Sequence, residues 1–373
     1  MIKSARTASA IDPTILDAQR RRGRGALSNS SGRFEPFGRE AADDGWESQA
    51  SLDKFATQVT LEHPRQVITR NDSPDLSFEQ SLNPYRGCEH GCIYCYARPT
   101  HAFLGLSPGL DFETRLVAKE SAATALRKEL ARPAYRPRAL AIGTNTDPYQ
   151  PIERQHHITR DVLEVLAETN HPVGIVTKSA LIMRDIDILG PMAAKGLVKV
   201  AISVTTLDRD LARRMEPRAS QPERRIETIA ALAEAGIPVT LMVAPIIPAL
   251  NDAEIETIMT RAFAAGAREV GYVMLRLPLE IAGLFTQWLH ENYPDRAEHV
   301  LQLVRSTREG GLYDSAFHKR MSGTGPYAFM IGRRVEVSAA RLGFNNKRLA
   351  LRTELFKAPK AHKNQADLFE TAA

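Results

Sequence analysis

Three cysteines lie within eight residues of this chain, and the chain has no others. Cys88, Cys92 and Cys95 follow the spacing C-x3-C-x2-C. Three thiols cannot all pair with one another, and so tight a spacing cannot staple distant parts of a secreted fold, so the pattern favours a reducing compartment, by default the cytoplasm. Thiolates also bind zinc and iron–sulfur clusters, so the spacing points to a metal or redox site.

Three kinds of chemistry fit these thiols. His90, inside the loop, could complete a Cys3His zinc site, although structural zinc usually draws its ligands from two separated pairs. A redox-active Cys-x-x-Cys pair with a bystander thiol is a second interpretation, but no helix-opening pattern of the thioredoxin kind follows it. The third is an iron–sulfur cluster, in which three thiolates leave one of four irons without a protein ligand. An open coordination position is typical of a catalytic metal, and this interpretation explains why there is no fourth cysteine.

The elements that must position this loop are alternating strands and helices. Short β-branched runs alternate with helical patterns of roughly ten to fifteen residues, which is typical of parallel βαβ units. Gly236 predicts the end of one helix, and Asn251–Asp252 predicts the capped start of the next. The predicted strands are residues 79–85, 139–143, 173–177, 198–204, 239–244 and 269–275. The predicted helices are residues 119–131, 160–168, 184–195, 222–235, 252–265 and 279–291.

Six such units with right-handed crossovers predict an α/β fold, a partial (β/α)6 barrel, short of the eight units that close a complete one. Chemistry in such barrels lies at the carboxyl ends of the strands. The polar and glycine-rich residues do gather there. The loops concerned are the cysteine loop and residues 143–150, 177–179, 203–206, 243–248 and 276–278.

The overall composition predicts a soluble protein with one large domain or two moderate ones. The region from Met1 to Asp17 has no apolar core of the signal-peptide kind. The most apolar run, residues 239–250, is broken by two prolines and suits a buried strand and its loop rather than a membrane span.

With these residues in view, the sequence resembles the radical S-adenosylmethionine (radical SAM) enzymes, whose motif is C-x3-C-x2-C with an aromatic residue, here Tyr94, before the last cysteine. The resemblance implies a [4Fe-4S] cluster held by Cys88, Cys92 and Cys95. It implies that the open iron binds S-adenosylmethionine, which splits reductively into methionine and a 5′-deoxyadenosyl radical. It also implies a partial (β/α)6 barrel and an electron donor such as flavodoxin or ferredoxin.

Within this family the sequence is most similar to the spore photoproduct lyase group, often named DNA repair photolyases, over residues 77–258. The similarity implies that Tyr94 lies beside the adenine and that Tyr96 takes part in hydrogen transfer. It implies that Thr146 and Asp147 meet the methionine amino group, and that Lys178 and Ser203 contact the carboxylate and the ribose.

Other residues carry weaker expectations. Arg218 could pair with the cofactor's carboxylate or fix a loop. Val243 and Ala244 could pack on the adenine or serve the core. Tyr149 and Glu153 are polar enough to line the site, whereas His156–His157 is expected to begin a helix rather than bind metal.

The sequence departs from the lyase pattern after the second strand. The lyase uses a further cysteine there to return a hydrogen atom to the substrate radical, and this chain has Asn145. An amide donates a hydrogen atom less readily than a thiol, so Tyr96 or Tyr149 could replace it, or the reaction could differ.

We expect four regions: a flexible basic N-terminal arm (1–60), the radical SAM core (61–290), a C-terminal extension (291–360) and a disordered tail (361–373). Ten Lys or Arg residues lie between His318 and Lys360, interspersed with Tyr327, Phe329 and Phe344. They suit a nucleic-acid substrate such as damaged DNA, or simply a solvated surface. The alternatives are radical modification of a tRNA or a peptide, and a non-catalytic nucleic-acid-binding protein clipped by an iron–sulfur cluster or zinc.

Overall fold

The main sheet of the protein has seven strands, six of them parallel and in chain order. The computed structural model describes residues 16–35 and 54–359. The order across the sheet is β10-β9-β8-β7-β6-β3-β2, and only β2 runs antiparallel to its neighbour. The bounds are β2 (Thr69–Arg70), β3 (Gln80–Leu82), β6 (Leu140–Ile142), β7 (Val173–Thr177), β8 (Val198–Ser203), β9 (Val239–Ile246) and β10 (Glu269–Met274). Because β10 and β2 form opposite edges, the predicted partial barrel is confirmed, in open form.

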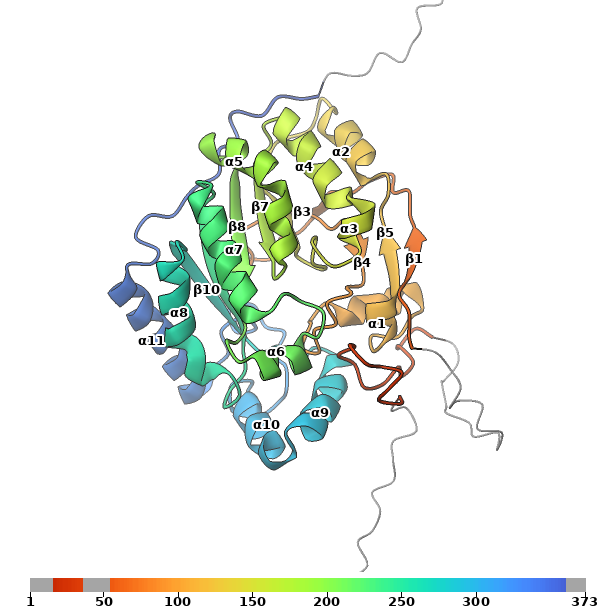
Figure 1. Cartoon of the computed structure of the whole chain (residues 1–373), viewed down its shortest axis with the longest axis vertical. Coiled ribbons are helices and arrows are strands. Elements are labelled where there is room, and N and C mark those ends of the chain that lie inside the picture. Colours follow the sequence, from red (N-terminus) through yellow and green to blue (C-terminus); the bar gives the residue numbers. More distant parts are fainter. Residues whose placement is uncertain (1–15, 36–53, 360–373) are drawn as a thin grey trace, which may run out of the picture.

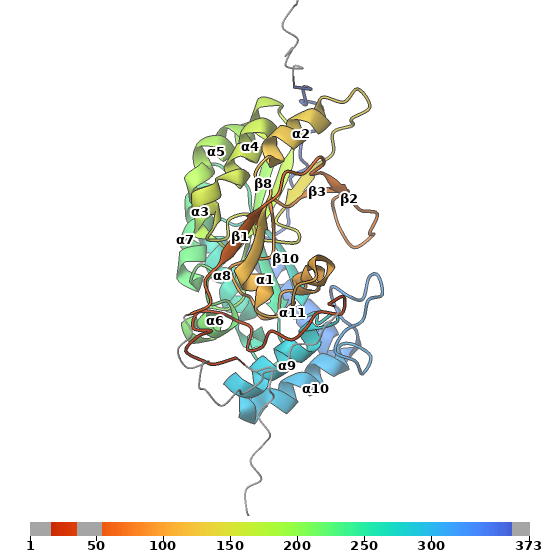
Figure 2. The ribbon, with the colours of Figure 1, turned by 90° about the vertical axis from the view of Figure 1, so that its right-hand side faces the viewer.

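A layer of helices covers one face of this sheet (Figures 1 and 2). Strand side chains alternate between the two faces: in β8, Val198, Val200 and Ile202 are buried, while Lys199 and Ala201 between them are partly exposed. The helices turn apolar residues towards the buried face, as Val162 and Leu166 do in α4. The helices of this layer are α2 (Ala122–Leu130), α4 (Ile158–Glu168), α5 (Ile186–Ala194), α7 (Pro222–Glu234) and α8 (Ile255–Ala264).

Two predictions about local structure need correction. The first predicted strand divides into β3 and β4 (Tyr85–Arg86), and β4 joins a small separate sheet with the order β1-β5-β4, formed with β1 (Gln58–Leu61) and β5 (Arg115–Ala118). Asn251 does not cap the following helix with its side chain. Its amide instead accepts from Ile247 N at 2.7 Å and donates to Thr205 O at 2.8 Å, which fixes the loop after β9. Gly236 does follow α7 in a left-handed conformation, as predicted.

Residues 16–35 of the expected flexible N-terminal arm (1–60) include a segment that packs into the protein, and residues 1–15 and 36–53 of that arm lie outside the described residues. Residues 25–28 are buried, with Ala26 and Ser28 fully inaccessible. We call residues 24–33 the strap. The strap runs past α1 (Asp111–Thr114) and α9 (Ile281–Asn292), and it is drawn in dark red in Figure 1.

Helices of the C-terminal extension pack into two hydrophobic clusters of the barrel. Ile331 and Val335 of α11 (Gly325–Leu342) lie in the main hydrophobic cluster. Val300 and Leu301 of α10 (Ala297–Ser306) lie in a second cluster that also contains Cys92. The expected tail, residues 361–373, lies outside the described residues.

Ion pairs occupy half of the ten basic residues between His318 and Lys360. Five of the ten form pairs with carboxylates: Lys319 with Glu309, Arg320 with Asp75, Arg333 with Glu336, Arg334 with Glu256 and Arg352 with Glu354. Phe344 is buried, whereas Phe329 is 76% exposed. Within the described ranges, no helix combines the length and the apolar character needed to cross a bilayer.

Candidate functional site

The three cysteines lie in the loop that follows β4. Two backbone hydrogen bonds shape this loop, from Cys88 N to Phe112 O at 2.9 Å and from Ile93 N to Met215 O at 3.0 Å. Cys88 and Cys92 are buried, and Cys95 is partly exposed. The loop therefore presents one accessible and two enclosed thiols.

The electrostatics of the thiols show that they lie near one another. Burial raises the pKa of Cys88 well above its usual value, and the neighbouring Asp147, Cys92 and Cys95 raise it further. Burial likewise raises the pKa of Cys92. Yet in the part of the chain that the structure describes, no three His, Cys, Asp or Glu side chains converge as one metal ion requires. Cys95 packs against the hydrophobic cluster that contains Cys92 and against the one that contains Cys88.

His90 faces Asp147, since its Nδ1 lies 3.4 Å from Asp147 Oδ2. The Cys3His zinc set is therefore not assembled among the described residues. Asp147 also accepts hydrogen bonds from Thr177 Oγ1 at 2.7 Å and from Lys178 N at 2.9 Å. Burial alone would raise the pKa of Asp147, but His90 and these hydrogen bonds hold it at about 2. Asp147 is thus a fixed anion between the loops after β6 and β7.

Thr146 stands beside this anion and is held by residues ahead of the cysteine loop. Its Oγ1 donates to Tyr85 O at 3.1 Å, and its backbone N donates to Asn83 Oδ1 at 3.3 Å. Asn83 Oδ1 also accepts from Asn145 N at 2.9 Å. One amide side chain therefore shapes the loop after β6, and Asn83 was not predicted from the sequence.

Lys178 continues this chain of contacts to the next strands. Its Nζ donates to Ser203 Oγ at 3.2 Å and lies 5.6 Å from the centre of the Tyr94 ring. Ser203 Oγ in turn donates to Ala244 O at 3.0 Å. The predicted residues Tyr94, Lys178, Ser203 and Ala244 are thus brought together.

A buried carboxylate, Glu216, lies behind these residues. The Tyr94 hydroxyl and the Arg225 guanidinium both donate to it, and Thr205 Oγ1 does so at 2.8 Å. Lys178 Nζ lies 3.9 Å from it. This network was missed because no single-sequence pattern links residue 216 to residue 94. The signal available was Arg225, which occupies the apolar face of the predicted helix alongside Ile226 and Ile229.

The rim of the site carries Tyr96 and Arg276. Tyr96 is 46% exposed, its hydroxyl donates to Thr144 O, and the Arg276 guanidinium lies 4.3 Å from its ring centre. Asn145 is partly exposed, with its amide 3.5 Å from Thr100 Oγ1. Tyr96 and Asn145 were predicted as site residues, whereas Arg276 was predicted only as part of the loop of residues 276–278.

Other predicted residues lie apart from this group. Tyr149 is buried with its hydroxyl towards Asp185, and burial together with that carboxylate raises its pKa well above the usual value. Val243 lies in the main hydrophobic core. Arg218 forms an ion pair with Glu89 at 2.7 Å, which corresponds to the loop-fixing alternative.

Glu153 is enclosed rather than lining the mouth. It bonds to Tyr85 and forms an ion pair with Arg184 at 2.8 Å. His156 ends α3 (Glu153–His156), and His157 joins it to α4, in agreement with a helical role.

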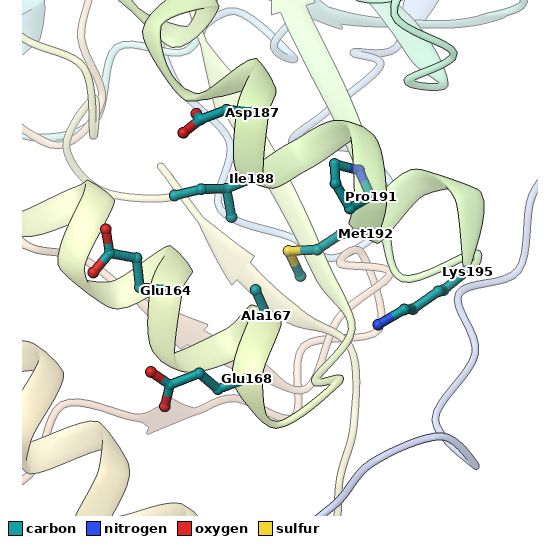
Figure 3. A pocket seen from close by; sticks show the side chains of 8 residues that line it. All are labelled: Glu164, Ala167, Glu168, Asp187, Ile188, Pro191, Met192 and Lys195. Carbon is teal, nitrogen blue, oxygen red and sulfur yellow. The ribbon is translucent and has the colours of Figure 1, made fainter.

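A depression of about 350 Å³ lies on the helix layer, between α4 and α5, and Figure 3 shows the side chains that line it. None of the predicted site residues lines it. Its lining residues are Glu164, Ala167, Glu168, Asp187, Ile188, Pro191, Met192 and Lys195. The candidate site is the loop cluster at the carboxyl edge of the sheet, where Asp147, Lys178 and Ser203 are joined by hydrogen bonds.

Comparison with known proteins gives an independent result. The family model described as "Radical SAM superfamily" matches residues 82–262, which include the cysteine loop and most of the parallel strands. An uncharacterised protein of Mycobacterium tuberculosis is 38% identical over 232 residues, 62% of this chain and 68% of that protein. An uncharacterised protein of Methanocaldococcus jannaschii is 27% identical over 220 residues, 59% of this chain and 78% of that protein.

Among solved structures, spore photoproduct lyase complexed with dinucleoside spore photoproduct has a similar fold. Its TM-score is 0.55 at 16% identity, over 77% of this chain and 80% of that chain. A lyase variant with bound AdoMet and the same dinucleoside gives a TM-score of 0.52 at 17% identity over the same shares. At these identities the likeness shows a common fold.

Proposed function

Because this chain belongs to the radical SAM superfamily, whose members bind a [4Fe-4S] cluster and S-adenosylmethionine, we propose that it is an enzyme that uses them to abstract a hydrogen atom from a nucleic-acid substrate. Cys88, Cys92 and Cys95 would hold the cluster and leave one iron for S-adenosylmethionine. When bound and reduced, the cofactor supplies a 5′-deoxyadenosyl radical. The protein contributes binding, orientation and the exclusion of water.

One observation carries the proposal: a line of polar contacts crosses the carboxyl ends of four neighbouring strands beside the cysteine loop. Asp147 after β6 binds Thr177 and Lys178 at the end of β7. Lys178 then binds Ser203 of β8, which binds Ala244 of β9. This row offers a small molecule one negatively charged side chain, Asp147, and one positively charged side chain, Lys178. An amino acid moiety carries an ammonium and a carboxylate, so it can bind both.

The roles within this row follow from charge. We assign the ammonium of S-adenosylmethionine to Asp147, with Thr146 beside it, since the low pKa keeps that carboxylate charged. We assign the carboxylate to Lys178 and the ribose to Ser203. Tyr94, fixed through its hydroxyl to Glu216, would pack beside the adenine together with Ala244.

The same geometry bears on hydrogen transfer. Of the three residues considered for it, Tyr96 is the exposed one beside the cysteine loop. Tyr149 is buried near Asp185, and Asn145 carries an amide. We therefore assign hydrogen donation to Tyr96. We also propose that a flavodoxin-like or ferredoxin-like protein delivers the electron and that the reaction takes place in the cytoplasm.

Wild-type protein reconstituted anaerobically with iron and sulfide tests the proposed cofactor chemistry. Adding S-adenosylmethionine should change the electron paramagnetic resonance spectrum of the reduced cluster, because the cofactor enters an open iron position. Chromatography should then detect 5′-deoxyadenosine. If the spectrum of a fully loaded cluster is the same with and without S-adenosylmethionine, the result would instead favour a non-catalytic protein that is clipped by the cluster.

The nucleic-acid assignment rests on aromatic rings exposed next to the cysteine loop. Phe103, in the 3-10 helix η2 (Arg98–Leu104) directly after that loop, is 70% exposed and lies 5.2 Å from Phe34, which is 56% exposed. The Arg33 guanidinium lies 5.0 and 5.6 Å from the two ring centres. Exposed rings flanked by arginine are a surface on which nucleobases stack. Five of the C-terminal basic residues already form ion pairs with carboxylates. They therefore support nucleic-acid binding less than their number in the sequence suggested.

Replacing Phe103 by alanine should weaken binding of a fluorescent single-stranded oligonucleotide. Loss of one base-stacking ring costs about 1–3 kcal/mol, or roughly 5- to 150-fold in Kd. The matched control is Phe329→Ala, which removes an equally exposed ring from α11, and it should leave Kd unchanged. An unchanged Kd for Phe103→Ala would contradict a nucleic-acid surface at the cysteine loop and favour a peptide substrate. Equal losses of affinity in the two variants would mean that the oligonucleotide does not bind preferentially at that loop.

A further inference from the structure

The strap is bound to the core by a buried carboxylate, Glu113 of α1. Its side chain is fully inaccessible. Its oxygens accept hydrogen bonds from two strap amides, Gly25 N at 2.9 Å and Ala26 N at 2.8 Å. They also accept a charged hydrogen bond from Arg98 at 2.6 Å. One carboxylate therefore joins the strap to Arg98.

Arg98 in turn holds the cysteine loop. It is fully buried three residues after Cys95, and it donates to the backbone carbonyls of Cys92 at 2.9 Å and Gly91 at 3.0 Å. It also donates to Pro108 O and Gly109 O. Because a buried guanidinium needs its counter-charge, Arg98 keeps this geometry only while Glu113 is in place.

The strap also touches the cysteine loop directly. A Cβ added to Gly25 would lie 1.9 Å from Gly91 O, and one added to Gly91, whose φ is +69°, would lie 2.6 Å from Glu113 Oε2. Leu27 packs in the same hydrophobic cluster as Cys92 and Tyr94. Only hydrogen atoms fit at both glycine positions, so the strap covers the loop at backbone contact distance.

The far end of the strap is anchored on α1 and α9. Asn29 and Asp111 exchange two hydrogen bonds, at 3.0 and 2.9 Å. Arg33 forms a two-oxygen contact with Glu280 at 2.7 and 2.8 Å. The strap is thus fastened at both of its ends, to Glu113 near Gly25 and to Glu280 at Arg33.

We propose that the strap is a clamp that holds the cysteine loop closed and thereby retains the iron–sulfur cluster. Gly25, Arg98 and Glu113 are its positioning residues, and opening of the strap is the step that exposes Cys92 for cluster insertion or loss. This inference rests on the proposed function in one respect, the assignment of the three cysteines as cluster ligands.

Thiol labelling of the cluster-free protein tests the clamp without any activity assay. The chain has three cysteines, all in this loop, so a chromogenic disulfide reagent reports on the loop alone. Gly25→Ala, which cannot keep the contact with Gly91, and Glu113→Gln, which loses the charge, should each speed labelling of the buried thiols about tenfold, equivalent to about 1.4 kcal/mol of lost protection. The control is Arg22→Ala, whose side chain is exposed just ahead of the strap, and it should label at the wild-type rate.

A second readout uses reconstituted protein, in which the strap variants should lose iron to a chelator faster than wild type or Arg22→Ala. Circular dichroism and unfolding midpoints identify any variant that has lost its fold. If Glu113→Gln has lost its fold, Gly25→Ala decides; if Gly25→Ala has lost its fold, Glu113→Gln decides by the same rates. Wild-type labelling and iron-loss rates in a folded Gly25→Ala would overturn the clamp. A wild-type protein that assembles no cluster would overturn the proposed function instead, while the labelling comparison would still decide on the clamp.

Discussion

Replacement of Cys92 by alanine is expected to abolish 5′-deoxyadenosine formation. The side chain is buried at the centre of the loop, and its removal would leave two thiolates for a cluster that already has one iron without a protein ligand. We expect the rate to fall at least about a thousandfold, a loss of about 4 kcal/mol in transition-state stabilisation. Chromatography of anaerobic reactions, together with the iron content of each preparation, measures both effects.

The matched control for this substitution is Ile93→Val, next to Cys92 and fully buried. It removes one methyl group from the same loop and should cost about 0.5–1.5 kcal/mol of stability while keeping cluster and product. A Cys92→Ala protein that still binds a full complement of iron and yields product would refute the ligand assignment. If both variants lost the product, the loop would tolerate no change. The loss of 5′-deoxyadenosine would then be explained by misfolding of the loop rather than by a missing cluster ligand.

The second large effect is expected for Glu216→Ala. This change leaves the Arg225 guanidinium, which is 2% exposed, buried without its carboxylate, and it frees the hydroxyl of Tyr94. Breaking a buried ion pair by removing one partner costs about 3–5 kcal/mol. Denaturant unfolding of the cluster-free protein should record a loss in this range, and the surviving folded protein should bind S-adenosylmethionine more weakly because Tyr94 and Lys178 lose their support.

Glu256→Ala provides the comparison, since Glu256 pairs with Arg334 on a partly exposed face, with side-chain exposures of 35% and 28%. Surface pairs of this kind contribute about 0–1 kcal/mol. If the two substitutions destabilise the protein equally, the buried network around Glu216 is not the support that its geometry indicates.

The strand and helix pattern of the chain was predictable because it is local. Val173–Thr177 was predicted with its observed bounds, since β-branched residues between turn signals are a short-range signature. The cysteine spacing predicted the metal chemistry for the same reason. Asp147, Lys178 and Ser203 were named from the resemblance to the spore photoproduct lyase group, and the structure brings them together at the carboxyl ends of parallel strands.

The supporting residues were not predictable, because their partners are distant in the chain. Tyr94 and Glu216 are 122 positions apart, and Gly25 and Glu113 are 88 apart. The strap was mistaken for a flexible arm because its composition is polar and rich in glycine, serine and arginine. It is buried through backbone amides and small residues, a kind of packing that hydrophobic periodicity does not reveal.

The spacing between the strap and its anchors also sets the order of events during folding. Ser28 bonds to Gln287 of α9, 259 positions further along the chain. Contacts this remote form late, because closing a long loop costs entropy before any contact repays it. The contact of Ser28 with α9 is therefore expected to form after neighbouring strands such as β7 and β8 have paired. The part of the strap at Ser28 is thus expected to dock on α9 only after the sheet has formed, so that part is the last of the strap to be fixed during folding.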